Sequence, residues 1–290
     1  MRKFFNIFAK QPDFALTEGA THVVTCGNNR KVAFTLAEGT THVVHWSNSR
    51  KIAFTLAEVL ITLGIIGVVA AMTMPSLITN YQKKQTVTQL KKAYSELYQA
   101  IKVSEKDYGT MEGWSLEGNG DEQIKDFSNN YLFPNIKILK SCIPSTNECW
   151  ADNILSLGGV EPLYDNPKNG VRASFIAASG YTVYYWLHST GGWFWVDVNG
   201  LKKPNIVGKD IFVLYLTFSQ TTSNACPDGT LNRVGFFPLG ASCEVIKDRE
   251  SLLDGSNYAC KKDRSLKAAG AYCGSLIMFD GWEIEKDYPW

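Results

Sequence analysis

The sequence predicts an α+β fold in which one long N-terminal helix packs on an antiparallel β-sheet. An apolar run from Phe54 to Met74 leads into a stretch with amphipathic helical spacing, and four strand-like segments gather after residue 170. These observations divide the 290 residues into five regions. They are a basic leader at 1–53, a transmembrane helix at 54–75, its amphipathic continuation at 76–107, a connecting region at 108–170, and a sheet domain with a disulfide-rich C-terminal part at 171–290.

The leader repeats itself. "RKVAFTLAEG" at 30–39 returns as "RKIAFTLAEV" at 50–59, and "FALTEGATHVVTCGNNRKVA" at 14–33 aligns with "FTLAEGTTHVVHWSNSRKIA" at 34–53, a period of 20 residues. Two copies and a fragment are too few for a solenoid, whose repeats must stack to bury a core. We interpret the repeat as a tandem duplication of a presequence, because only the last copy runs into an apolar segment.

That apolar segment predicts a membrane-spanning helix. Phe54–Met74 is 21 residues long (74 minus 53), and its only ionisable side chain is Glu58. At about 1.5 Å per residue, such a helix covers the roughly 30 Å hydrocarbon core of a bilayer. A helix in a soluble core is the alternative, but such helices are seldom apolar on every face for this length.

The junction "KIAFTLAEVLITLGIIGVVAAMTMP" resembles the processing segment of type IV pilins and type II secretion pseudopilins. In that family a membrane peptidase cuts after a small residue, and the new N-terminus is methylated. The resemblance places this cut between Ala53 and Phe54. It makes Glu58 the family's fifth-position acid, and it puts Gly67 and Pro75 at mature positions 14 and 22 (67 and 75 minus 53). The family prefers glycine before the cut, where this chain has alanine.

The resemblance implies a pilin-like fold and a structural subunit of a type IV pilus or a type II secretion pseudopilus. Its expected partners are other pilin or pseudopilin subunits, the prepilin peptidase, an inner-membrane assembly platform and the lipid bilayer. Assembly runs through Phe54, Glu58, Gly67 and Pro75. A carboxylate in a lipid-facing helix costs about 2.5–3.5 kcal/mol on insertion scales and needs a partner. In the family, this acid meets the terminal amine of a neighbouring subunit. The alternative is that Glu58 snorkels to the interface.

Charge and cysteine content indicate which side of the membrane the domain occupies. The leader holds seven basic and three acidic residues, so the remaining chain has 22 basic and 25 acidic residues (29 minus 7 and 28 minus 3). The sequence contains no basic stripe with interleaved aromatic residues, so a nucleic-acid site is not expected. Arg50 and Lys51 favour a cytoplasmic N-terminus, whereas Lys83, Lys84 and the lysines after them weaken that argument. The expected location is the inner membrane, crossed once, with a periplasmic or extracellular C-terminal domain.

Six cysteines lie beyond the leader, an even number that predicts disulfides in an extracytoplasmic domain. They are Cys142, Cys149, Cys226, Cys243, Cys260 and Cys273. The tight "CIPSTNEC" loop favours Cys142–Cys149, and sequential pairing gives Cys226–Cys243 and Cys260–Cys273. Reduced, buried cysteines are the alternative. The sequence contains no CxxC motif, so a structural zinc site is not expected.

Past Pro75 the pattern turns amphipathic. Val87, Leu90, Tyr94, Leu97 and Ile101 step by three or four residues and form one apolar stripe. The sequence therefore predicts one helix from about residue 54 to 104, bent or loosened at Pro75, because proline removes a backbone donor.

The rest of the chain predicts short helices and then strands. A helical piece is expected at 121–130, and strands at 171–178, 181–187, 193–198 and 211–218, with "SG" and "STGG" as hairpin turns. Their aromatic residues are expected in the sheet core and at subunit contacts rather than as a sugar platform. The last aromatics, in "GWEIEKDYPW", predict a final strand and turn on the sheet.

One loop between strands offers oxygen ligands. Asp197, Asn199, Asn205 and Asp210 lie in "DVNGLKKPNIVGKD", and calcium prefers such oxygens. Major pseudopilins carry a calcium site in a loop of their β region, so the resemblance also favours calcium here. The alternative is a loop whose Asp and Asn side chains cap their own turns. Apart from calcium no cofactor is expected.

An enzyme is not predicted. Only His188 remains after the leader, and no G-x-S-x-G, P-loop or H-E-x-x-H motif occurs. Two alternatives to a structural subunit stay open: a minor tip pilin that binds DNA, a surface or a secreted cargo, and a membrane-anchored enzyme.

Overall fold

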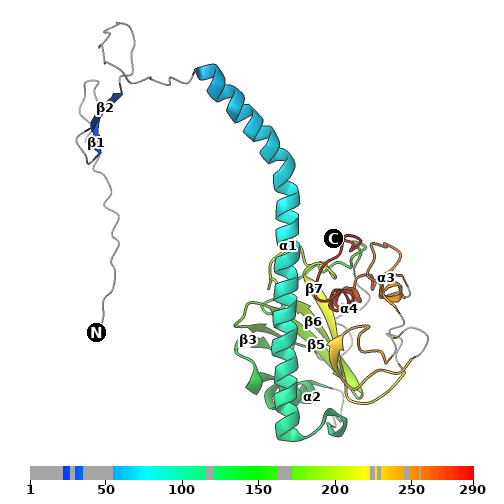
Figure 1. Ribbon diagram of the computed structural model, residues 1–290. Helices are drawn as coiled ribbons and strands as arrows, with labels where there is room; N and C mark the ends of the chain where they lie inside the picture. Colours follow the sequence, from blue (N-terminus) through cyan, green and yellow to red (C-terminus); the bar gives the residue numbers. More distant parts are fainter. Residues whose placement is uncertain are drawn as a thin grey trace, which may run out of the picture. The chain divides into compact units, whose positions relative to one another are not determined.

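The predicted long helix is present as α1, Leu56–Tyr108, in the computed structural model of this chain (Figure 1). The structure describes residues 55–114, 120–161, 172–222, 226, 230–244, 248–254 and 256–290, together with the backbone of two strands at 22–26 and 30–34. The chain divides into two units, Met1–Leu63 and Gly64–Trp290, and the boundary falls within α1. The helix continues through Pro75 without a break.

The first unit contains a two-stranded hairpin that the sequence analysis did not predict. Strands β1 (His22–Cys26) and β2 (Arg30–Phe34) pair antiparallel, with His22 opposite Phe34. Both strands fall in the predicted leader. The predicted cut between Ala53 and Phe54 lies outside the described residues.

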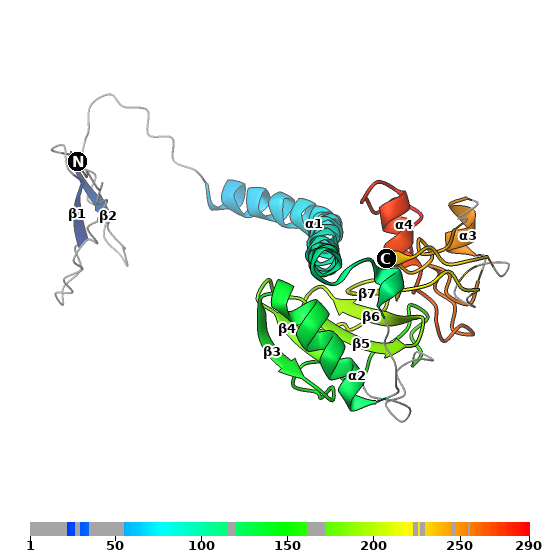
Figure 2. The same cartoon turned by 90° about the horizontal axis from the view of Figure 1, so that it is seen from below.

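A six-stranded antiparallel sheet forms the centre of the second unit (Figure 2). Its strands follow the order of the sequence from one edge to the other. They are β3 (Ile138–Cys142), β4 (Ala173–Ala177), β5 (Thr182–His188), β6 (Gly191–Asp197), β7 (Ile211–Thr217) and β8 (Gly235–Pro238). The four predicted strands are confirmed as β4 to β7. The edge strands β3 and β8 are additions.

The first two hairpins form where the sequence places turn residues. Gly180, between β4 and β5, has a φ of +98°, a conformation that costs glycine little. Gly191 opens β6, and a Cβ there would stand 2.1 Å from the carbonyl oxygen of Leu216 on β7. Only glycine therefore lets β6 and β7 approach so closely at this point.

Aromatic side chains fill both faces of the sheet. On one face, Tyr185 and Phe194 stack with ring centroids 5.0 Å apart, and Phe127 lies 6.3 Å from Phe194. On the other face, Tyr184 stacks on Trp150 at 5.4 Å. The aromatic residues expected in the sheet core lie there: Trp186 is partly buried, and the others are buried, namely Tyr184, Tyr185, Trp193, Phe194 and Trp195.

The second half of α1 packs on this core with the predicted stripe. Val87, Leu90, Leu97 and Ile101 are buried. Tyr94 is partly buried, its ring stacks on Phe236 of β8, and its hydroxyl donates to the Phe236 carbonyl at 3.2 Å. The helix therefore shares one hydrophobic core with the sheet.

Short helices complete the second unit. They are η1 (Met111–Gly113), α2 (Asp121–Asp126), the π-helical turn η2 (Phe127–Leu132), η3 (Phe133–Asn135), α3 (Glu250–Leu253) and α4 (Cys273–Phe279). The helical piece predicted at 121–130 is confirmed by α2 and η2. The predicted final strand is wrong: α4 ends at Phe279, with Leu276 and Ile277 buried, and residues 281–290 form turns and irregular chain.

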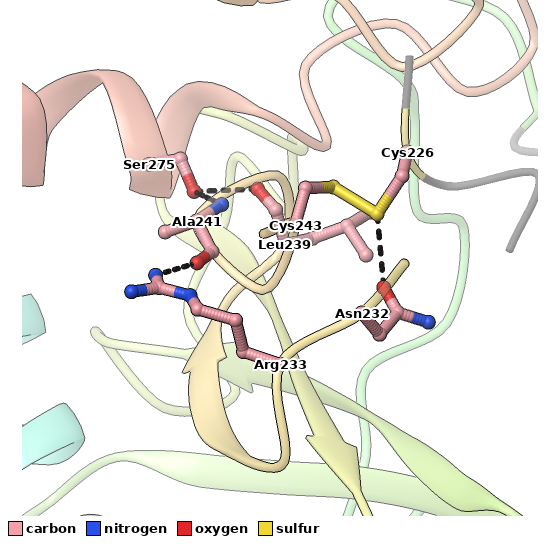
Figure 3. Close-up of a disulfide and its surroundings, with 7 residues drawn as sticks. All are labelled: Cys226, Asn232, Arg233, Leu239, Ala241, Cys243 and Ser275. Carbon is pink, nitrogen blue, oxygen red and sulfur yellow. Dashed lines mark hydrogen bonds between the residues drawn. A yellow bond between two sulfur atoms is a disulfide. The ribbon is translucent and has the colours of Figure 1, made fainter. Parts of the chain in front are cut away.

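Three disulfides close loops in this unit, and all three sequential pairings are present: Cys142–Cys149, Cys226–Cys243 and Cys260–Cys273. Figure 3 shows the surroundings of the second, where Oδ1 of Asn232 lies 2.9 Å from Sγ of Cys226. Nearby, the amide of Ala241 donates to the hydroxyl of Ser275 at 2.8 Å. This bond ties the disulfide loop to α4.

Candidate functional site

Two features of the described chain are candidates for a functional role, because packing of the domain does not explain them. The first is the apolar half of α1. The helix is long and apolar enough to span a membrane, and its apolar part is not buried. The exposed apolar side chains are Leu56, Val59, Leu60, Ile61, Leu63, Ile65, Ile66, Val68, Val69, Met72, Met74, Leu77 and Ile78.

Glu58 closes a capping box at the start of this helix. The Thr55 amide and hydroxyl donate to Oε2 of Glu58 at 2.8 and 3.0 Å, and the Glu58 amide donates to the Thr55 hydroxyl at 3.2 Å. Such a reciprocal pair satisfies amides at a helix N-terminus that otherwise lack acceptors. Within the described residues Oε1 of Glu58 accepts no hydrogen bond, so one carboxylate oxygen stays available.

Gly67 and Pro75, the other predicted assembly residues, lie inside α1. A Cβ at Gly67 would meet nothing within 4 Å, so the fold of this chain does not require glycine there. Pro75 is exposed on α1.

The second feature is the loop between β6 and β7, where the structure brings together all four predicted oxygen ligands. Asp210 is the centre: its Oδ2 accepts from the Asn205 amide at 2.8 Å and from Nδ2 of Asn199 at 3.1 Å. Its Oδ1 accepts from the Ile206 amide at 2.6 Å. The Asn199 amide donates to Oδ1 of Asp197 at 3.1 Å. The predicted turn capping is therefore present.

Capping does not satisfy the whole cluster. Asp197 Oδ2, Asn199 Oδ1 and Asn205 Oδ1 are buried oxygens without a hydrogen-bond partner. Asp197 and Asp210 are 0% and 3% exposed, and among the described residues neither forms an ion pair. Buried, unpaired carboxylates and amide oxygens cost free energy unless something satisfies them.

Burial and mutual repulsion dominate the electrostatics of this cluster. Burial, with the nearby charge of Asp210, raises the pKa of Asp197 to about 8, although the Asn199 amide opposes the shift. Burial also raises the pKa of Asp210 against the hydrogen bonds that it accepts. A bound cation relieves both costs, because it attracts the ionised form of each carboxylate.

The donor set fits a hard cation. Two carboxylates and two amide oxygens are the ligands that calcium prefers, with water or carbonyl oxygens completing six to eight positions. Among the described residues no three His, Cys, Asp or Glu side chains gather as a metal site. A thiolate or imidazole metal centre therefore has no candidate in the part of the chain that the structure describes.

The loop is held by chain segments that the sequence analysis did not connect to it. Nδ2 of Asn205 donates to the Asp152 carbonyl at 3.3 Å, and the Tyr288 hydroxyl donates to the Gly208 carbonyl. A cleft of about 310 Å³ opens beside the loop, lined by Asn199 and Asp210 and by glutamines of α1. Lys202 and Lys203, which lie in the same loop, are exposed.

His188, the histidine expected to remain after processing, makes contacts through both ring nitrogens. Nε2 lies 3.2 Å from the Tyr215 hydroxyl and Nδ1 lies 3.0 Å from the Thr190 hydroxyl. Burial lowers its pKa. These contacts fix the hairpin between β5 and β6.

Comparison with known families adds one match. Residues 76–290, more than half of the chain, match the model of a family of unknown function, DUF6613. The chain belongs to the DUF6613 family. The region shared with DUF6613 begins directly after Pro75, so it contains the amphipathic half of α1, the sheet and the β6–β7 loop. No match to this chain was found among curated proteins or among solved structures.

Proposed function

We propose that this DUF6613 chain is a structural subunit of a type IV pilus or type II secretion pseudopilus. It enters the inner membrane as a precursor and is cut between Ala53 and Phe54. It is then N-methylated and polymerises with other subunits through the first half of α1. The observation that carries the proposal is that half of α1 is apolar on all sides and exposed, while the other half is packed on its own domain.

The proposed orientation follows from the same observations. The helix crosses the membrane once, with its N-terminus in the cytoplasm. The domain with three disulfides lies in the periplasm or outside the cell, because disulfides persist in oxidising compartments. During assembly the exposed apolar half passes from lipid into a filament core, so its side chains remain away from water in both states.

Glu58 has a role in this proposal beyond its capping box. The carboxylate lies four residues after Phe54, about one helical turn, and its free Oε1 can accept from the terminal amine of a neighbouring subunit. In the apolar surroundings that exclude water, the amine would take the place of water as the partner of the Glu58 carboxylate.

A pair of substitutions separates assembly from capping. Glu58→Ala removes both roles, whereas Thr55→Ala breaks the capping box and leaves the carboxylate. We expect Glu58→Ala to abolish filaments seen by electron microscopy of cells. Thr55→Ala should retain them, and Glu122→Ala on the exposed surface of α2 should behave as wild type. Equal loss in Glu58→Ala and Thr55→Ala would mean that Glu58 only caps its helix.

Calcium in the β6–β7 loop is a second part of the proposal. Asp197, Asn199, Asn205 and Asp210 would hold the ion, which supplies positive charge to a buried acidic cluster. The loop contacts the 150s segment through Asn205 and the tail through Gly208. A cation there would therefore stabilise the domain rather than serve a reaction.

A further inference from the structure

The end of the domain from which α1 continues toward its apolar half carries lysines and tryptophans. Figure 1 places the C-terminal segment at this end, beside α1. Nζ of Lys83 lies 6.0 Å from the ring centroid of Trp290, and Nζ of Lys91 lies 5.8 Å from that of Trp282. Both tryptophans are only partly buried.

Clefts on both sides of α1 extend this surface. Lys203, Lys209 and Trp290 line the cleft of about 310 Å³ beside the β6–β7 loop. Lys83, Lys84 and Trp282 line a second cleft of about 600 Å³. We name these six residues, Lys83, Lys84, Lys203, Lys209, Trp282 and Trp290, the lysine–tryptophan rim.

The rim is positively charged, and no carboxylate among the described residues neutralises its lysines. Among the described residues none of its four lysines forms an ion pair. The carboxylates nearest in the sequence differ: Asp280 and Asp287 are bound by Arg249, whereas Glu283 is exposed in the second cleft. Glu285 is also exposed, so four lysines stand against two free carboxylates and the surface remains basic.

The rim also lies at a defined height on the helix. Ile78 is the last aliphatic side chain of the exposed run, and Lys83 follows five residues later, about 7.5 Å along the axis. That distance is within the Debye length of about 8 Å at physiological salt. Partly exposed tryptophans and lysines next to a transmembrane span are the residues that meet lipid headgroups.

We propose that the lysine–tryptophan rim binds the headgroups of anionic phospholipids in the leaflet beneath the domain. The inference rests on the proposed membrane anchoring by α1. Phosphate groups accept from the lysine ammonium groups, and the indole rings lie at headgroup level. The rim thereby holds the domain on the membrane surface before the subunit leaves the bilayer.

The test uses the full-length chain in nanodiscs made of phosphatidylcholine alone or with phosphatidylglycerol. Acylation of each lysine is followed by mass spectrometry. We expect the rim lysines to react about fivefold more slowly when phosphatidylglycerol is present, and the difference to vanish at high salt. Lys106, about 35 Å further along α1, is the internal control and should not respond.

Variants refine the result. Lys203→Gln with Lys209→Gln should reduce the lipid-dependent protection of Lys83, whereas Lys125→Gln on α2 should leave it unchanged. Equal reactivity in both kinds of disc, with the chain inserted, would overturn the rim and leave the anchor intact. Protection that follows the number of copies per disc rather than the lipid would assign this face to a second subunit. A chain that enters neither disc would overturn both the anchor and the rim.

Discussion

The two halves of α1 belong to one unbroken helix and treat their apolar side chains in opposite ways. From Leu90 to Ile101 the apolar residues follow a stripe and lie in the domain core. From Leu56 to Ile78 they occupy all sides and remain exposed. The family match has nearly the same boundary, because it begins at residue 76 and leaves out the apolar run before it.

This difference indicates which contacts stabilise each half of α1. A stripe of about 100° is what a helix needs when one neighbour covers it, and the sheet supplies that neighbour. A helix that is apolar all round must be enclosed on every side to be kept from water, and the described residues do not enclose the first half. In the proposed function, lipid or other copies of the same helix enclose the first half.

The largest expected effect is a matched pair of leucine truncations. Leu97 is fully buried and Leu63 is 60% exposed. Leu97→Ala should lower the free energy of unfolding by about 3 kcal/mol through lost contacts and a cavity. Leu63→Ala should change it by less than about 0.5 kcal/mol. Denaturant unfolding of the chain in mild detergent measures both, and similar losses would erase the distinction between the halves.

A second pair places a charge on each half. Ile65 and Val103 are both exposed, at 60% and 44%. Ile65→Arg should raise the free energy of membrane insertion by about 2.5–3.5 kcal/mol, because the guanidinium enters hydrocarbon. Val103→Arg should have no effect, since that position faces water. A glycosylation-based insertion assay reports the inserted fraction of each variant, and equal fractions would contradict a membrane role for the first half.

The third prediction concerns the proposed calcium site in the β6–β7 loop. Calcium at about 100 times its dissociation constant should stabilise the domain by about 2.7 kcal/mol relative to chelator, and should leave insertion of the helix unchanged. Thermal melts with calcium and with EDTA test this expectation. Equal midpoints would remove the calcium site.

Asp197→Asn is the matched variant for that measurement. The pKa of Asp197 rises from 3.8 to about 8 in the folded chain, so the folded state holds this proton to higher pH than the unfolded state. In EDTA the free energy of unfolding should therefore fall as pH rises from about 4 to about 8. The asparagine should weaken this dependence, leaving the part due to Asp210, gain about 1–3 kcal/mol at pH 8 without calcium, and abolish the calcium response. A pH-independent wild type would contradict the account of the site.

Much of this architecture was predictable because the signals were local. The stripe of α1, the four central strands and the three disulfides follow from spacing, turn residues and cysteine order. The edge strands escaped prediction for physical reasons. In β3 three consecutive residues, Leu139 to Ser141, are exposed, so no alternation marks it, and β8 is only four residues long.

The structures of the C-terminal segment and of the proposed calcium site could not be predicted fully from local sequence signals. "CGSLIMF" is a short apolar run that suits a helix or a strand, and packing decides: Gly274 fits against Phe212 and Pro238, where a Cβ would stand 3.8 and 3.5 Å away. Oxygen-bearing residues in the β6–β7 loop were visible in the sequence. Their three unpartnered oxygens, and the support from Asp152 and Tyr288, depend on segments far apart in the chain.

The most direct test of the central claim is the mass of the chain recovered from the membrane fraction of the cells that make it. The account predicts a mature protein that begins at a methylated Phe54 and has lost residues 1–53. A membrane-bound chain that still carries its basic leader, or one whose N-terminus lies elsewhere, would contradict it.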